Sequence, residues 1–394
     1  MPFASEPLFT HGQVPKTAVL YCNLGTPDAP TPAAVRRYLA EFLSDHRVVE
    51  IPRLLWLLIL SGIILRFRPA KSAAKYASIW TAEGSPLKLW TEKQAALLQQ
   101  ALSARGEQVL VRWAMRYGST SIASQLDALK AEGVNRVLLL PAYPQYSATT
   151  TASVFDAVYT WAARTRTVPE FRFINRYHDD AGYISALAAT VQAHWAANGR
   201  GDKLVMSFHG VPERTLHLGD TYHCECHKTA RLLGEALGLD RSQYQVTFQS
   251  RLGRAKWLEP YTEPTLIALG QGGLKRVDLI CPGFSGDCLE TLEEINMEAR
   301  EAFLEAGGST FHYIPCMNDQ PAWIDALAAV SQQHMAGWPT REAANAAALQ
   351  ASQAAALAWA RPAERCKRAA NCAGPDGGAA RLRFAGCADP HRRY

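Results

Sequence analysis

The chain has 394 residues, which is long enough for two domains, and its hydrophobic content of 48% and charged content of 20% are typical of a soluble protein with a large core. The formal net charge is +5, but residues 341–394 carry nine basic and four acidic side chains, so the first 340 residues are neutral overall. Nucleic-acid binding by the folded body is therefore not indicated, because phosphate recognition needs a basic surface patch.

Residues 1–16 contain no basic segment followed by an apolar one, so we expect no signal peptide. The nine cysteines are odd in number and unevenly spread, and without a secretory signal they are most simply reduced thiols. We therefore predict a cytoplasmic protein and leave open a peripheral position on the inner face of the cell membrane.

The first half alternates between strand-like and helix-like segments. The apolar run 18–24 is interrupted by Gly25, as is typical of a buried strand followed by a turn. The next segments are an amphipathic helix over 31–43, a helix over 91–104, a strand over 109–117, a helix over 121–131 and a strand over 137–141. This alternation predicts a parallel, doubly wound sheet.

Residues 54–65 form an uncharged apolar run between Arg53 and Arg66. The run is shorter than the roughly 20 residues that a bilayer-spanning helix needs. Two interpretations stay open, namely a buried helix, or apolar surface presented to a membrane or at the entrance to an apolar ligand's site.

The second half repeats the alternation after about residue 160. Its strands are predicted at 171–174, 203–208, 244–250 and 277–281, and its helices at 184–197, 221–237 and near 266–273. We predict an α/β protein with two similar doubly wound parallel-sheet domains, Rossmann-like in type, and a cleft between them.

The predicted boundaries follow from these elements. An N-terminal domain with an apolar lip covers 17–160, and a C-terminal domain that carries His209 and Glu290 covers 161–320. A helix within 321–342 is expected to pack back on the N-terminal domain, and residues 343–394 to form an alanine-rich segment followed by a disordered tail.

Three carboxylates follow the last predicted strand. Pro282 ends that strand, and Glu290, Glu294 and Glu298 then recur at intervals of four residues, which stacks them on one face of an α-helix. Asp287 is a plausible N-cap in a capping box with Glu290. Like charges so placed repel, and a hard cation would relieve the repulsion, although acids in a first helical turn also suit the helix dipole.

A histidine stands in the equivalent place after an earlier strand. His209 directly follows the buried run 203–208, and Gly210 and Pro212 fix a turn after it. Ligands of open α/β sheets bind at this carboxyl edge. We expect His209 and Glu290 to end equivalent strands in facing domains and to meet across the cleft.

The segments Ser-Phe-His-Gly-Val-Pro at 207–212 and Pro-Gly-Phe-Ser-Gly-Asp-Cys-Leu-Glu at 282–290 closely resemble the ferrochelatase family. Further landmarks of that family occur in order at 23–27, 84–87, 143–147 and 248–258, so the likeness covers residues 17–338. The resemblance implies a chelatase-like fold and a lyase of haem biosynthesis that inserts Fe²⁺ into protoporphyrin IX.

The resemblance also implies residue roles. His209 and Glu290 are expected to be catalytic, with His209 removing the pyrrole protons. His209, Glu290 and Glu294 are expected to bind the metal. The predicted walls and rim of the porphyrin site are Leu24, Phe42, Leu43, Arg116, Tyr117, Tyr146, Trp257 and Phe284.

Two departures from the family pattern matter. Animal members carry a histidine where this chain has Cys288, for which we favour a packing role. Members with a [2Fe–2S] cluster have a cysteine where this chain has Ala148, and Cys366, Cys372 and Cys387 in the tail are spaced differently. Since such a cluster needs four ligands, we predict none, and no cofactor beyond the substrate iron.

Three alternatives remain at this stage. The enzyme could be a chelatase for another metal, such as cobalt, or for coproporphyrin III. A non-catalytic haem-binding protein is the third, but such a protein has no use for a base beside a carboxylate ladder.

Overall fold

The computed structural model describes residues 3–7, 15–251, 253, 255–341, 350–351 and 354–355. The chain divides into two units, one of Met1–Leu8 with Val14–Glu342, the other of Phe9–Gln13 with Ala343–Tyr394. The first unit carries the fold and the site. Most of the predicted alanine-rich and disordered tail, including Cys366, Cys372 and Cys387, lies outside the described residues.

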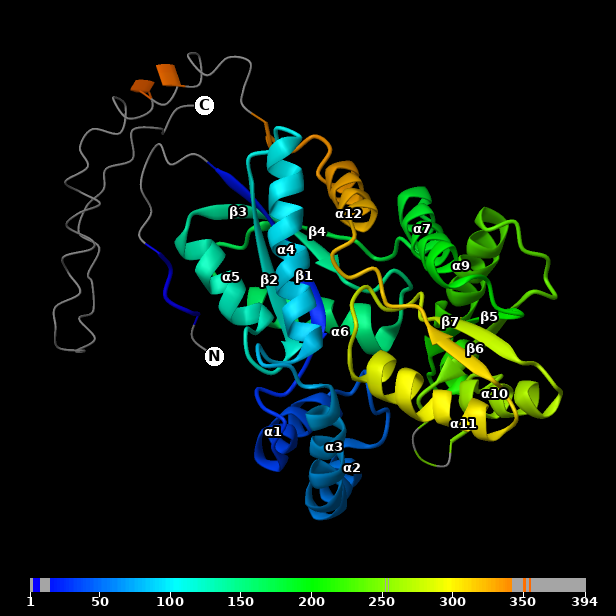
Figure 1. Cartoon of the computed structure of the whole chain (residues 1–394). Coiled ribbons are helices and arrows are strands. Elements are labelled where there is room, and N and C mark those ends of the chain that lie inside the picture. Colours follow the sequence, from blue (N-terminus) through cyan, green and yellow to red (C-terminus); the bar gives the residue numbers. More distant parts are fainter. Residues whose placement is uncertain are drawn as a thin grey trace. The chain divides into compact units, whose positions relative to one another are not determined.

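Two four-stranded parallel sheets form the frame of the first unit (Figure 1). The first has the order β2-β1-β3-β4 and the second β6-β5-β7-β8, so each half arranges its strands in the same way. The strands are β1 Lys16–Gly25, β2 Val109–Tyr117, β3 Val134–Pro141, β4 Glu170–Phe173, β5 Lys203–His209, β6 Tyr244–Gln249, β7 Arg276–Ile280 and β8 Thr310–Tyr313. The prediction of an α/β protein with two similar parallel sheets is confirmed.

Helices connect the strands and cover the sheets. In the first half they are α1 Pro32–Leu43, α2 Arg53–Ile59, the π-helix η1 Leu60–Ile64, α3 Leu65–Ile79, α4 Pro86–Ala104, α5 Ile122–Ala131, the π-helix η2 Ala148–Ala152, α6 Ser153–Ala162 and α7 Ala181–Asn198. In the second half they are α8 Glu213–His217, α9 Tyr222–Ala236, α10 Thr262–Gln271, the π-helix η3 Glu290–Ala299, α11 Arg300–Glu305 and α12 Pro321–His334.

The boundary predicted at residue 160 is wrong. Strand β4 lies beyond it but pairs with β3, with Val137 opposite Phe171, so the first sheet reaches at least to residue 173. The sequence reveals a short apolar strand there, but a strand of four residues carries no local signal for the sheet that it joins.

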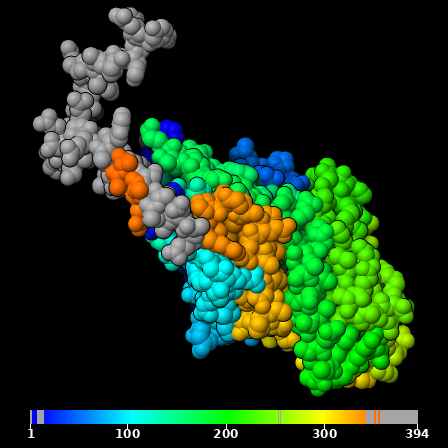
Figure 2. Space-filling view, turned by 90° about the horizontal axis from the view of Figure 1, so that it is seen from above, coloured from blue at the N-terminus to red at the C-terminus, as the bar shows by residue number. Residues whose placement is uncertain are grey.

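The two halves share one hydrophobic core. Val19 and Tyr21 of β1 belong to the same buried cluster as Met206 and Phe208 of β5. The last helix of each half packs on the other half. Helix α7, the last of the first half, contacts α9 of the second half, and α12, the last of the second half, contacts α4 of the first half. Figure 2 shows α12 (orange) at the surface between segments of the first half and the middle of the chain. The halves therefore fold as one body.

We call α1, α2, η1 and α3 the apolar lip. Its inner side packs around Val35, Leu60 and Tyr117. Its outer side exposes large apolar side chains, with exposed fractions of 83% for Leu54 and 74% for Leu58. The surface interpretation of residues 54–65 is thus the one the structure supports. No helix among the described residues is long and apolar enough to cross a membrane.

Candidate active site

The backbone fixes the tautomer of His209, the last residue of β5. Its Nδ1 lies 2.6 Å from the carbonyl oxygen of Gly210. Because a carbonyl can only accept a hydrogen bond, Nδ1 must carry the proton. The neutral imidazole of this half-buried residue therefore has its lone pair on Nε2, where a base can use it.

The turn after His209 requires glycine. A Cβ on Gly210 would lie 2.7 Å from the carbonyl oxygen of Gln249 and 3.2 Å from the Trp257 ring. The absence of a side chain lets the Trp257 indole approach the turn closely, and Pro212 pairs with Trp257 through a β-bridge. Trp257, a predicted wall residue, is thereby held next to the predicted base.

The carboxylates lie on a π-helix, η3, and not on an α-helix. The predicted ladder of three is therefore wrong in its last member. Glu298 pairs with Lys75 of α3 at 2.7 Å, and Glu293 pairs with the same ammonium group at 2.9 Å. Residues five apart are neighbours in π-helical winding, whereas the prediction assumed α-helical spacing.

Glu294 is tied to the end of the neighbouring strand, β6. The backbone N–H of Ser250 donates to one carboxylate oxygen at 2.7 Å, and the Ser250 hydroxyl donates to the other. Ser250 reaches both with a left-handed backbone, φ 62°. Burial raises the pKa of Glu294, and the negative charge of Glu290 adds to this increase. The hydrogen bond from the Ser250 hydroxyl and the charge of His209 offset part of it.

Gln249 links the strand ends to η3. It lies opposite His209 in the β5–β6 pairing, and its Nε2 donates to the Glu290 carbonyl at 2.8 Å and to Glu294 at 3.4 Å. His209 and Glu290 are thus brought together, but from neighbouring strands β5 and β7 of one sheet. The expectation that the two strands lie in facing domains is wrong, because both belong to the second sheet, which falls within the C-terminal domain predicted at 161–320.

Asp287 does not cap η3 as predicted. Its carboxylate is buried and accepts hydrogen bonds from Asn318 at 2.7 Å and from the Tyr313 hydroxyl at 2.5 Å. The Thr291 hydroxyl accepts from the Cys288 N–H instead. Asp287 therefore fastens the loop before η3 to the loop after β8. Cys288 is buried, and burial raises the pKa of its thiol, which fits a packing role.

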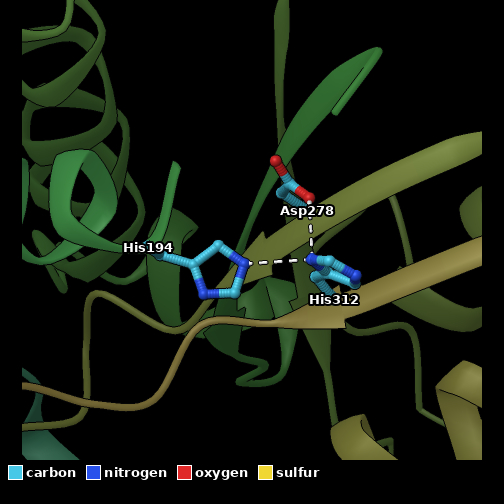
Figure 3. Close-up of side chains that lie close together, drawn as sticks. All are labelled: His194, Asp278 and His312. Carbon is cyan, nitrogen blue, oxygen red and sulfur yellow. Dashed lines mark hydrogen bonds and ion pairs between the residues drawn. The ribbon is translucent and has the colours of Figure 1, made fainter. Parts of the chain in front are cut away.

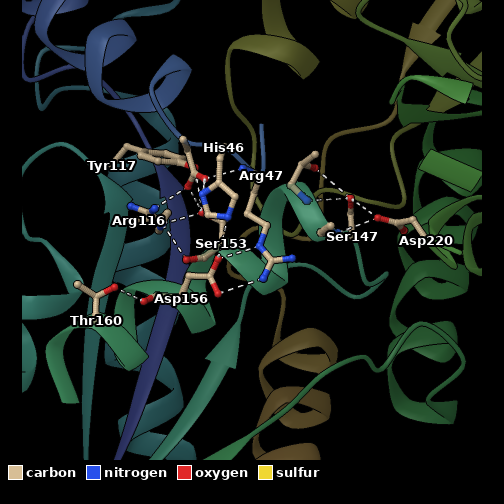
Figure 4. A network of polar contacts seen from close by, with 12 residues as sticks. His46, Arg47, Arg116, Tyr117, Ser147, Ser153, Asp156, Thr160 and Asp220 are labelled. Carbon is tan, nitrogen blue, oxygen red and sulfur yellow. Dashed lines mark hydrogen bonds and ion pairs between the residues drawn. The ribbon is translucent and has the colours of Figure 1, made fainter. Parts of the chain in front are cut away.

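Arg116, Tyr117 and Ser153 lie together in a polar network (Figure 4), and Arg116 and Tyr117 bond there to the buried carboxylate of Asp45. The Arg116 guanidinium lies 2.5 Å from Asp45, and the Tyr117 hydroxyl donates to Asp45 at 2.8 Å. Ser153 bonds to all three side chains. Burial raises the pKa of Asp45, but the hydrogen bonds to it and the charge of Arg116 leave that pKa below its usual value.

The chain was compared with known proteins. A sequence model of the ferrochelatase family matches residues 16–335. The chain is similar to the ferrochelatase of Polaromonas sp., with 68% identity over 92% of this chain and 100% of that protein. It is equally similar to the ferrochelatase of Methylibium petroleiphilum, with 68% identity over 89% of this chain and 97% of that protein. The chain belongs to the ferrochelatase family.

Ferrochelatases are lyases, so membership confirms the enzyme class that the motifs imply. Among solved structures, the chain is similar to SirB from Bacillus subtilis with Fe³⁺, with 13% identity over 81% of this chain and 96% of that one. The TM-score of that match is 0.49.

The remaining residues predicted to line the porphyrin site fall into two groups. Leu24, Phe42 and Leu43 belong to the cluster of the apolar lip, where the Phe42 ring meets Tyr117 edge-on at 5.1 Å. Leu289, just before η3, packs against the same cluster, which joins the lip to the carboxylates. Phe284 packs instead against the second-half core.

Tyr146 is half-buried and lies near the charges of Arg47 and Arg176. Its backbone N–H donates to Glu225 at 2.7 Å, and the Arg176 guanidinium lies 5.5 Å from its ring centre. The structure thus places Tyr146 within reach of a cation. Its role in binding substrate, like those of Arg116 and Tyr117, stays a prediction.

Sequence reasoning missed Gln94, which fastens both active-site loops of the second half. Its Nε2 donates to the carbonyl oxygens of Ser285 at 2.8 Å and Asn318 at 2.7 Å, and its Oε1 accepts from Tyr21 at 2.7 Å. A buried amide in an amphipathic helix is a weak signal, since the polar residue occupies a core position of α4.

Replacing Gln94 by leucine is expected to lower the free energy of unfolding by about 2–4 kcal/mol, because it leaves two buried carbonyls and a hydroxyl unpaired. Urea denaturation measures this value. Gln100→Leu, at an exposed position of the same helix, is the matched control and should change stability by less than about 0.5 kcal/mol. Equal stabilities of the two variants would contradict the fastening role.

Proposed function

We propose that this ferrochelatase inserts Fe²⁺ into protoporphyrin IX and that His209 is its base. The observation that carries the proposal is the hydrogen bond of His209 Nδ1 to its own turn, which leaves Nε2 able to accept a proton beside Glu290 and Glu294. A metal-binding protein without catalysis needs ligands, but it does not need a base of fixed tautomer next to them.

The proton balance sets what the site must do. Insertion of Fe²⁺ into the neutral porphyrin replaces two pyrrole N–H protons, so two protons leave for each metal that enters. In the proposed mechanism His209 Nε2 takes a proton from the ring. Glu290 and Glu294 bind the iron beside the base and receive the departing protons, and Ser250 and Gln249 keep Glu294 oriented for this.

The porphyrin itself is flat and apolar. In the proposal, Trp257 and the inner residues of the apolar lip form its walls, so its affinity rests mainly on apolar contact. A rigid pocket that fits a bent macrocycle better than a flat one would bind the transition state more tightly than the substrate.

His209→Ala is expected to lower the metallation rate at least about 100-fold, since a positioned base contributes about 10²–10⁴. Glu290→Gln should be nearly as severe. Porphyrin affinity, measured by fluorescence quenching, should change little in either variant.

The matched controls are His217→Ala, at an exposed position of α8, and Glu298→Gln, whose carboxylate faces Lys75. Both should metallate at nearly the wild-type rate. A His209→Ala enzyme that keeps more than about a tenth of the wild-type rate would exclude His209 as the base.

Iron affinity should depend on the protonation of Glu294. Because the pKa of Glu294 is raised, its carboxylate is protonated, and lost as a ligand, at a higher pH than an ordinary glutamate. As the pH falls, the KM for Fe²⁺ should therefore begin to rise at a higher pH than the titration of an ordinary glutamate would give. In Glu294→Gln the KM should be high throughout and should vary less with pH, whereas Glu298→Gln should behave like the wild type. A wild-type profile in Glu294→Gln would exclude this role.

The choice of metal and tetrapyrrole is tested with the same assay. Protoporphyrin IX with Fe²⁺ should give a higher kcat/KM than coproporphyrin III with Fe²⁺ or protoporphyrin IX with Co²⁺. The reverse order for either pair would assign the enzyme to the corresponding alternative substrate.

The apolar lip also supports a proposal of peripheral membrane contact. Leu54, Leu58 and Phe67 are 83%, 74% and 71% exposed, and Arg53 and Arg66 on the same segments are exposed. Apolar side chains flanked by basic ones suit an interface with anionic lipid. An apolar substrate could then pass between membrane and protein without crossing water.

The triple variant Leu54→Ser, Leu58→Ser, Phe67→Ser is expected to bind anionic phospholipid vesicles at least about tenfold more weakly in co-sedimentation, because burial of each such side chain contributes about 1.5–3 kcal/mol. Leu218→Ser is the matched control, since Leu218 is 67% exposed but lies outside the lip. Equal binding by both variants would exclude the lip as the membrane contact.

A further inference from the structure

Two histidines and a buried aspartate converge far from His209 (Figure 3). His194 comes from α7, Asp278 from β7 and His312 from β8. His194 Nε2 lies 3.2 Å from His312 Nδ1, which lies 3.9 Å from an oxygen of Asp278. One ligand atom of each residue falls within 4.8 Å of the other two.

The fold holds these side chains in place. Asp278 and His312 are register partners on the adjacent strands β7 and β8, so they point to the same face of the sheet. Asp278 Oδ2 accepts from the Trp195 indole at 2.7 Å and from the Gly201 N–H at 2.6 Å. Those bonds orient its other oxygen, Oδ1, toward the histidines.

We propose that His194, Asp278 and His312 bind one divalent transition-metal ion, with Zn²⁺ as the reference ion. Nitrogen and oxygen ligands bind zinc tetrahedrally at about 2.0–2.2 Å, which spaces the ligand atoms about 3.3–3.6 Å apart. The observed separations of 3.2 and 3.9 Å bracket that spacing. Two imidazoles with one carboxylate are a common donor set for zinc, and water completes the fourth position.

The positive charge of Arg276 opposes a cation here. Its guanidinium binds the carbonyl oxygens of Asn198 at 3.0 Å and Gly199 at 2.5 Å. Its contacts with Asp278 at 3.4 Å and with His312 at 3.3 Å are long by comparison. Arg276 therefore has partners that do not depend on the site, but its charge lowers the affinity for a cation.

The proposed site is separate from the chelation site. Asp278 aligns with Leu204 of β5, five residues before His209, which is about 16 Å along the strand. A metal bound there would join α7, which follows the first sheet, to two strands of the second sheet. Its effect would be to stabilise the union of the two halves, because it binds only the folded arrangement.

The test counts bound Zn²⁺ by equilibrium dialysis in the purified full-length protein and measures the unfolding temperature with and without Zn²⁺. Zn²⁺ bound at this site should raise the unfolding temperature of the wild type. His194→Gln and His312→Gln should each bind one Zn²⁺ fewer than the wild type and should not show this rise. His209→Ala is the matched control. It alters the chelation site, so Zn²⁺ bound at the proposed site should still raise its unfolding temperature. Both glutamine variants should still metallate porphyrin.

The Zn²⁺ affinity of Arg276→Gln separates metal binding from a purely structural role, because a structural role predicts no change in that affinity. Removing the positive charge should tighten Zn²⁺ binding at this site about tenfold or more. Unchanged Zn²⁺ stoichiometry in both His194→Gln and His312→Gln would overturn the proposal and leave the histidines as a hydrogen-bonded pair. If either glutamine variant does not fold, His312→Asn replaces it in the same comparison.

Discussion

The π-helical winding of residues 290–299 is the constraint on which the site depends. With α-helical winding, Glu290, Glu294 and Glu298 would share one face and repel one another. In η3 the acids divide into two sets. The Glu294 carboxylate faces the end of β6, where Ser250 and Gln249 bond to it, while Glu293 and Glu298 share Lys75. Glu294 is thus held at the end of the strand that pairs with β5, whereas the charges of Glu293 and Glu298 are neutralised by Lys75.

The sequence predicted the layers of the fold well, because buried parallel strands read as continuous apolar runs and the runs alternate with helical periods. It did not predict how the halves join. That α7 lies on the second half and α12 on the first is decided by long-range packing around Tyr183 and Trp323, whose ring centres are 5.9 Å apart. No local pattern encodes such an exchange, and the misplaced boundary at residue 160 has the same cause.

At the candidate site, the sequence indicated which residues stand at the ends of strands. It did not indicate which side chains hydrogen-bond to each other. His209 and Glu290 could be proposed from the sequence because each follows a buried strand at the edge where ligands of such sheets bind. Asp45, Gln94 and Ser250 could not, since each is a single polar residue whose importance comes from a partner far away in the sequence. The ladder failed at Glu298 for a different reason, because π-helical winding changes which residues are neighbours and residues 290–299 read equally well as an α-helix.

The lip and the carboxylates are coupled parts of one site, and the size of each contact shows how. Lys75 joins α3 to η3 through partly exposed ion pairs, and such pairs contribute about 0–1 kcal/mol. Leu289 packs against the lip cluster immediately before Glu290; full burial of a leucine contributes about 1.5–3 kcal/mol, and the partly buried Leu289 gains a fraction of that. The apolar contact is therefore at least comparable to either ion pair. A lip that shifts on binding an apolar ligand would move Leu289, the N-cap residue immediately before η3.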